Sequence, residues 1–274
     1  MKIYRTHMAL SVLYTIVMSE LFIKEVKHIW IVPLAFVTAW VGIFLLIWTV
    51  IALISLTIDI GKKYDAPNKF YTKLLNYGYS YIFALAGARV KVSGLEKVPK
   101  DQKYLIISNH RSNFDNMVQS YYLRSCPIAY ISKQSNFKIP IGRRFIIRNC
   151  YLSIDRESPL KSLRTINEAT KMVESGITSI GIFPEGRRSK DKNLGNFKAG
   201  FLRIASNSGC PILITTISGT EKIHKHFPFL TRVYFDVLGV LTKEDYEGLD
   251  PAELSERIRE MMQANLIKRE GTVK

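Results

Sequence analysis

The sequence predicts an α/β fold, in which a layered sheet is flanked by helices and preceded by an amino-terminal membrane-associated helical segment. Short β-branched runs alternate with helical stretches from residue 88 onward, which is the pattern of a layered α/β sheet. Residues 29–58 carry no charged side chain, although 23% of the chain is charged. A chain of 274 residues can also bury a substantial core. We therefore predict a membrane-associated helical segment over residues 1–63 and a globular domain over residues 64–274.

Apolar and alternating runs identify the strands. Ala88-Arg-Val-Lys-Val-Ser93 alternates with the period of two that a half-buried strand requires, and Tyr104-Leu-Ile-Ile-Ser108 is a short apolar run. Later runs of the same kind are bounded by Pro, Gly or polar residues. We predict strands at residues 88–93, 104–108, 129–132, 151–154, 177–183, 211–218 and 232–240.

Capping and stop signals identify the helices. Asp250-Pro-Ala-Glu253 combines an N-cap, a proline at the first helical position and a capping-box glutamate. Asn207-Ser-Gly209 ends a helical stretch that begins at Phe197. We predict helices over residues 115–123, about 159–174, 197–205 and 250–267.

The uncharged stretch at residues 29–58 is long enough to cross a bilayer, because about 20 apolar residues suffice for a helix. Pro33 and Gly42 could kink this helix or allow a membrane-embedded helical hairpin. Met8–Ile23 is a second apolar stretch, interrupted by Glu20. Its length leaves open whether it forms a second span. The stretch at 29–58 is too long for a signal-peptide core and has no small-x-small cleavage site at its end.

Basic residues give the expected orientation. Gly61-Lys-Lys63, Lys69 and Lys73 follow the long apolar stretch, which places the following domain on the cytoplasmic side of the membrane by the positive-inside rule. Lys24 and Lys27 flank the other end. They oppose this orientation if Met8–Ile23 also crosses, and the charge bias is weaker still if it does not.

The net charge of +16 requires an anionic partner. Nucleic acid is disfavoured by the bilayer-length segment and by the absence of a recognition motif, whereas an anionic membrane or a phosphorylated ligand suits both features. The three cysteines show no metal-binding spacing and suit a reducing compartment. His224-Lys-His226 is too short for a metal site, and we expect a surface loop there.

The first candidate catalytic motif is Asn109-His-Arg-Ser-Asn-Phe-Asp115. His110 is expected in the turn after the strand 104–108, and Asp115 in the first turn of the next helix. Ser112, three residues before Asp115, resembles the start of a capping box. A carboxylate on one imidazole nitrogen fixes the tautomer and supports the cation that forms when the other nitrogen takes a proton. The pair could therefore activate a hydroxyl, although a buried histidine beside a capping aspartate would give the same pattern.

The second candidate motif follows the apolar run Ile177–Phe183 and reads Pro184-Glu-Gly-Arg-Arg-Ser189. A strand that ends in Pro and Gly, with a carboxylate and two arginines at its end, suggests a site at the carboxyl edge of a sheet. Arg187 and Arg188 can offer planar, multi-donor contacts to a phosphate. A solvated basic turn is the alternative.

The N-H-x4-D and F-P-E-G-x-R-S motifs, in this order, resemble the glycerolipid acyltransferase family, most closely its members that acylate 1-acylglycerol-3-phosphate. The resemblance covers about residues 85–245. Lys133–Arg156 is similar to the block between the two motifs, and Cys210–Gly219 is similar to the final block. Arg187 stands where the family commonly has Thr, so the phosphate-binding arginine of the family corresponds to Arg188.

The resemblance implies that His110 removes a proton from a lysophospholipid hydroxyl while Asp115 orients the ring. The hydroxyl oxygen would then attack the thioester of acyl-CoA or acyl carrier protein. No metal or redox cofactor is implied. Glycerol-3-phosphate or another lysophospholipid remains open as the acceptor, and so does a non-catalytic membrane lipid-binding role. The expected substrate-binding residues are Asn109, Lys133, Arg156, Glu185, Gly186, Arg187 and Arg188.

Overall fold

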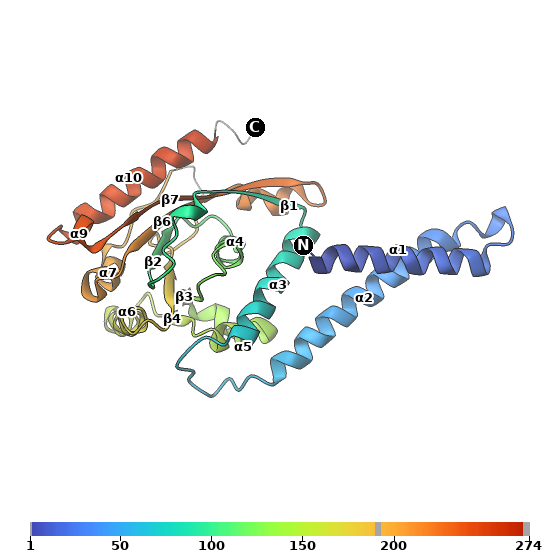
Figure 1. Cartoon of the computed structure of the whole chain (residues 1–274), viewed down its shortest axis with the longest axis horizontal. Coiled ribbons are helices and arrows are strands. Elements are labelled where there is room, and N and C mark those ends of the chain that lie inside the picture. The colour runs from blue at the N-terminus through green and yellow to red at the C-terminus, as the bar shows by residue number, and fades with distance from the viewer. Residues whose placement is uncertain (1, 190–192, 271–274) are drawn as a thin grey trace. The chain divides into compact units, whose positions relative to one another are not determined.

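The computed structural model describes residues 2–189 and 193–270. The chain divides into two compact units, Met1–Asp59 and Ile60–Lys274, and the boundary predicted from the sequence lies at residue 63. We call them unit 1 and unit 2, and Figure 1 colours unit 1 in blue.

Unit 1 is a pair of helices with polar side chains between them. Helices α1 (Lys2–Phe22) and α2 (Ile31–Leu56) are joined by the 3-10 turn η1 (Val26–His28) and pack against each other. His7 of α1 lies 2.9 Å through its Nε2 from the carbonyl oxygen of Trp40, and the two rings stack. Ser11 and Thr15 are also buried, and each hydroxyl donates to a carbonyl one turn earlier in α1.

The outer surface of unit 1 is apolar. Large side chains such as Leu13 and Ile16 of α1 and Leu45 and Leu53 of α2 are exposed, while the buried side chains of α1 are polar. Small and polar residues at helix contacts, with apolar residues facing outward, are typical of helices in a bilayer. Within residues 2–189 and 193–270, α2 is the one helix long and apolar enough to span a membrane.

Unit 2 contains a mixed sheet of seven strands in the part of the chain that the structure describes, in the order β1-β7-β6-β2-β5-β3-β4. All neighbouring strands are parallel except β6 and β7, which are antiparallel. The strands are β1 (Ala88–Ser93), β2 (Leu105–Ser108), β3 (Ile128–Lys133), β4 (Leu152–Ile154), β5 (Ser179–Ile182), β6 (Ile212–Ser218) and β7 (Thr231–Leu241).

Helices cover both faces of this sheet, as Figure 1 shows. Helices α3 and α4 pack together on one side, whereas α6, α7 and α10 lie on the other. The central strands are buried on both faces, which explains their continuous apolar sequence. The helices are α3 (Lys69–Leu85), α4 (Asp115–Tyr122), α5 (Pro140–Arg148), α6 (Pro159–Glu174), α7 (Arg203–Ser208), α8 (Ile223–His226), α9 (Lys243–Tyr246) and α10 (Pro251–Glu270).

The predicted α/β fold class is confirmed, and every predicted strand is present within a few residues of its expected ends. The stretch predicted as a helix over residues 197–205 begins later, as the 3-10 helix η4 (Ala199–Leu202), and continues into α7. The predicted loop at His224-Lys-His226 is wrong, because these residues belong to the short helix α8. No prediction covered α3 or α5.

Candidate active site

The carboxyl ends of β2 and β5 bring the two motifs together. These strands are parallel neighbours, so the residues that follow them meet at one edge of the sheet. Asn109 directly follows β2, and its side-chain amide donates to the carbonyl of Ile217 and accepts the amide hydrogen of the same residue, both at 2.8 Å. Asn109 thus extends the pairing of β2 with β6 and fixes the start of the turn that carries His110.

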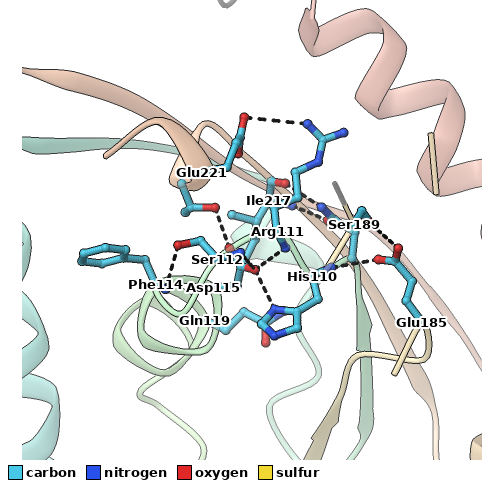
Figure 2. A network of polar contacts seen from close by, with 12 residues as sticks. His110, Arg111, Ser112, Phe114, Asp115, Gln119, Glu185, Ser189, Ile217 and Glu221 are labelled. Carbon is cyan, nitrogen blue, oxygen red and sulfur yellow. Dashed lines mark hydrogen bonds and ion pairs between the residues drawn. The ribbon is translucent and has the colours of Figure 1, made fainter. Parts of the chain in front are cut away.

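Asp115 is fully buried and accepts four hydrogen bonds. Its Oδ2 lies 2.8 Å from Nδ1 of His110 and also accepts the backbone amides of Arg111 at 2.6 Å and Ser112 at 2.7 Å. Its Oδ1 accepts the hydroxyl of Thr220 at 2.6 Å. Figure 2 shows these contacts converging on the carboxylate. Several donors of this kind stabilise a buried carboxylate in its charged form.

The predicted capping box at Ser112 forms only in part. The carboxylate of Asp115 accepts the backbone amide of Ser112, as in a capping box, but the Ser112 hydroxyl accepts the amide of Phe114 at 3.3 Å. The amide of Asp115 instead donates to the carbonyl of Ser112. Helix α4 therefore begins at Asp115, and the carboxylate of this residue binds the turn that carries His110.

The second motif holds the backbone of His110 from both sides. Oε1 of Glu185 accepts the amide hydrogen of His110 at 2.9 Å, and the amide of Ser189 donates to the carbonyl of His110 at 2.8 Å. Oε2 of Glu185 accepts the Ser189 hydroxyl and the amide of Gly195. Figure 2 shows Glu185 pointing at this turn. The two motifs are thus parts of one structure, and Glu185 supports the histidine.

The His110 ring is fixed by two neighbours. An ionised carboxylate can only accept, so Nδ1 carries the proton that it shares with Asp115, and Nε2 is the basic nitrogen. The ring of Phe183 stacks on the imidazole at a centroid distance of 4.4 Å, and Tyr130 stacks on Phe183 in turn. The imidazole is about one-fifth exposed and lines the cavity described next.

A cavity of about 1120 Å³ opens beside His110. Among the described residues its lining contains no Asp or Glu. Its apolar lining includes Tyr130, Ile131, Ile154, Leu163, Ile166, Ile182, Phe183 and Phe201. Its cationic lining is Arg111, Lys133, Arg156, Arg187, Arg188, Lys198 and Arg203. The cavity therefore combines an apolar surface with a strongly positive one, as an amphipathic anionic ligand requires.

Five of the seven predicted substrate-binding residues line this cavity: Lys133, Arg156, Gly186, Arg187 and Arg188. Burial lowers the pKa of the Arg156 guanidinium from its usual value, although an arginine still keeps its charge at neutral pH. Gly186 has a φ of 69°, and a Cβ there would lie 3.2 Å from Cε of Lys198. The glycine thus allows the close approach of Lys198.

The other two predicted residues lie behind the site. Asn109 and Glu185 are buried, are absent from the cavity lining, and make their hydrogen bonds to protein groups. Their interpretation as substrate contacts is corrected on this geometry: both position the His110 turn. Thr220, Lys198 and Arg203 were not predicted. Thr220 is 105 residues from Asp115, and no local pattern connects Lys198 and Arg203 to the second motif, although they follow it in the sequence.

The basic residues between the two motifs also divide into some that line the cavity and others that do not. Lys133 and Arg156 reach the cavity, whereas Lys138, Arg143, Arg144 and Arg148 are not in its lining. Arg148 donates to the carbonyl of Ala66 at 2.9 Å and lies over the ring of Tyr64. No cluster of His, Cys, Asp and Glu with metal-binding geometry occurs among the residues that the structure describes.

Comparison with known proteins places this site in a family. A family model described as acyltransferase matches residues 89–218, which include both motifs. A 1-acyl-sn-glycerol-3-phosphate acyltransferase of Borreliella burgdorferi is 29% identical over 69% of this chain and 75% of its own length. The chloroplastic 1-acyl-sn-glycerol-3-phosphate acyltransferase BAT2 of Brassica napus is 33% identical, over 49% of this chain and 39% of its own length.

A solved structure shares the fold. The crystal structure of the 1-acyl-sn-glycerophosphate acyltransferase PlsC from Thermotoga maritima aligns with a TM-score of 0.63 at 22% identity. The alignment covers 97% of this chain and 98% of that protein. The sequence relatives, the family model and the shared fold confirm the resemblance drawn from the two motifs. Residues 89–218, which contain both motifs, thus match the acyltransferase family.

Proposed function

We propose that this chain transfers an acyl chain from the thioester of acyl-CoA or acyl carrier protein to the free hydroxyl of 1-acylglycerol-3-phosphate. The product would be phosphatidic acid, for phospholipid synthesis. The observation that carries the proposal is the His110–Asp115 pair beside a cavity that is both apolar and positively charged. The names of the sequence relatives support the same acceptor.

The proposed reaction uses the basic Nε2 of His110. This nitrogen removes the proton from the acceptor hydroxyl, and Asp115 stabilises the imidazolium through its contact with Nδ1. The oxygen forms a bond to the thioester carbonyl carbon, and the carbon–sulfur bond then breaks. The departing thiolate takes its proton from His110, which returns to its neutral state. Proton transfer and attack on the thioester are complete with these groups, so the reaction as proposed requires no metal or redox cofactor.

The two kinds of cavity lining suit the two ends of the acceptor. Arginine side chains bind phosphate through paired hydrogen bonds, and Arg156, Arg187 and Arg188 supply such donors. Side chains such as Ile166 and Phe201 can cover acyl chains. His110 lines the same cavity, so the hydroxyl of an acceptor bound there can approach the imidazole.

His110→Ala tests the chemistry. Removing a well-placed general base lowers turnover by ~10²–10⁴-fold, and we expect that loss in kcat with the variant still folded and membrane-bound. His226→Ala is the matched control, because His226 is exposed and outside the cavity lining. Near-normal turnover by His110→Ala would remove this residue from the mechanism.

An acceptor panel tests the substrate. Purified protein is assayed for thiol release with lysophosphatidate, glycerol-3-phosphate and neutral lysolipids, each with acyl-CoA and acyl carrier protein donors. We expect lysophosphatidate to have the highest kcat/KM. A preference for glycerol-3-phosphate or a neutral lysolipid would reassign the acceptor, and thioester consumption with none of them would favour a lipid-binding protein.

We further propose that unit 1 holds the chain in the membrane with unit 2 on the cytoplasmic side. The length and composition of α2 and the outward apolar surface of unit 1 support membrane insertion. Lys62, Lys63, Lys69 and Lys73 follow α2 and support the cytoplasmic side by the positive-inside rule. Protease added to sealed right-side-out vesicles should leave unit 2 intact. Digestion of unit 2 in these vesicles would show that it lies on the opposite side of the membrane.

A further inference from the structure

The loop Phe227-Pro-Phe-Leu230, which connects α8 to β7, exposes three large apolar side chains among four consecutive residues. Phe227 is 63% exposed, Phe229 76% and Leu230 58%. Single apolar side chains on a surface are ordinary, but a cluster of them marks a surface that binds something. We call this segment the Phe227–Leu230 loop.

The backbone of the Phe227–Leu230 loop is held in place on the sheet. The amide of Phe229 donates to the carbonyl of His226 at 2.6 Å, and the amide of Thr231 donates to the carbonyl of Gly87 at 2.9 Å. Gly87 has a φ of 64°, and a Cβ there would lie only 2.9 Å from the carbonyl oxygen of Phe229. The fold thus fixes the backbone of the loop against the turn before β1, while the side chains of Phe227, Phe229 and Leu230 remain exposed to solvent.

The Phe227–Leu230 loop lies on the same edge of the sheet as His110. Strand β6 is parallel to β2, whose carboxyl end leads to His110, so the end of β6 at Ser218 is at that edge. Strand β7 is antiparallel to β6, so its beginning at Thr231 is at that edge too. The connection between them contains both Thr220, which holds Asp115, and the loop. Figure 1 shows this orange connection beside the start of β1.

The surroundings of the loop are basic. Residues 222–235 contain two lysines, one arginine and two histidines but no Asp or Glu. Arg232 is exposed and pairs in register with the exposed Arg89 of β1. Within the described residues, neither arginine nor Lys225 forms an ion pair with a carboxylate within 4 Å. Aromatic and leucine side chains surrounded by cations are the composition of a surface that enters the headgroup region of an anionic bilayer.

We propose that the Phe227–Leu230 loop is a lipid-binding surface of unit 2, which seats the edge of the sheet that carries His110 on an anionic bilayer. Phe227, Phe229 and Leu230 enter the interface, while Lys225 and Arg232 meet the lipid phosphates. This contact goes beyond the proposed reaction, because it belongs to unit 2 itself and concerns binding to lipid in the absence of turnover.

Fluorescent labelling of the full chain tests the contact directly. In a Cys126→Ser background, in which the remaining cysteines are buried, an environment-sensitive dye is attached at Phe229→Cys or at Leu95→Cys. Leu95 is the matched control, because it is 39% exposed and follows the carboxyl end of β1, at the opposite edge of the sheet. On vesicles of phosphatidylcholine with phosphatidylglycerol, we expect a blue shift and quenching by spin-labelled lipid at 229 and neither at 95.

Two other results of this labelling experiment would overturn the proposal. A dye at 229 that stays in a water-like environment on the vesicles would show that the loop does not enter lipid. A blue shift at 229 that needs no vesicles and increases with protein concentration would show that the loop binds a second copy of the chain instead.

A kinetic experiment adds a consequence for activity and rests on the proposed function. The combined variant Phe227→Ser, Phe229→Ser and Leu230→Ser should raise the KM for lysophosphatidate embedded in vesicles severalfold, with little change for a short-chain acceptor dissolved as monomers. Equal effects on both acceptors would show that the loop supports the site through the fold. A wild-type chain inactive with both would refute the proposed function, while the fluorescence result would still decide the lipid contact.

Discussion

Replacing Glu185 with glutamine tests whether this side chain positions His110 or contacts the acceptor. Oε1 accepts the amide hydrogen of His110 at 2.9 Å, and Oε2 accepts that of Gly195 at 3.1 Å together with the Ser189 hydroxyl. A glutamine offers one accepting oxygen and one donating amide. The Ser189 hydroxyl can rotate to accept, but a backbone amide cannot. In either orientation the glutamine therefore faces one backbone N–H with another donor.

The size of the effect follows from these contacts. A buried N–H without an acceptor costs about 1–3 kcal/mol, and hydrogen bonds to charged groups contribute about 1.5–3 kcal/mol each. We expect Glu185→Gln to lower the free energy of unfolding by ~2–4 kcal/mol. Part of this lost stabilisation acts on the turn that carries His110 and would displace the imidazole. We therefore expect kcat to fall by ~10–100-fold, since 1.4 kcal/mol corresponds to tenfold. The KM for the acceptor should change little, because Glu185 does not line the cavity.

Initial rates with both substrates varied, together with urea unfolding, measure these quantities. Glu174→Gln is a control for the loss of one charge, because Glu174 is exposed near the end of α6. Ser189→Ala removes a single donor from Glu185 and should have a smaller effect than Glu185→Gln. A raised acceptor KM with unchanged kcat and unchanged urea unfolding would refute this reasoning and would indicate that Glu185 contacts the acceptor.

Three further predictions concern other parts of unit 2. Arg188→Ala should raise the acceptor KM by about tenfold to a hundredfold, and Arg187→Thr by much less, in steady-state kinetics; the reverse order would exchange the two roles. Thr220→Val should lower kcat and shift the pH profile of kcat/KM, because it removes the 2.6 Å hydrogen bond to the buried carboxylate of Asp115 beside His110, and Thr220→Ser should restore both. Burial alone would raise the pKa of Asp236, but the hydrogen bonds that it accepts, chiefly from Arg269, lower the pKa below its usual value. The unfolded pKa is then the higher one, so this stabilisation is complete above about pH 4 and is lost as the pH falls further. Asp236→Asn should therefore lower the free energy of unfolding by ~1.5–3 kcal/mol at neutral pH and flatten its decline in acid, and a parallel acid decline in both proteins would contradict this.

Features of the fold that depend on neighbouring residues could be predicted from the sequence. The strands followed from their β-branched runs, and the start of α10 followed from Asp250, whose side chain accepts the amide of Ala252 at 2.7 Å. The contact of His110 with Asp115 spans only five residues, so their spacing was sufficient to predict it. Helix α5 could not be predicted in this way. It contains Gly142 and several β-branched residues, and it is stabilised by packing of the buried Phe145.

The roles of the buried polar residues were decided by the tertiary structure. Asn109 and Glu185 stand inside the two polar motifs of this chain, yet their side chains bind Ile217 and the backbone of His110. Thr220 reaches Asp115 from 105 residues away. A buried polar group must find a hydrogen-bond partner, and folding supplies whichever one lies within reach. That partner depends on the register of β2 with β5 and β6, which is a long-range property that no local pattern of residues encodes.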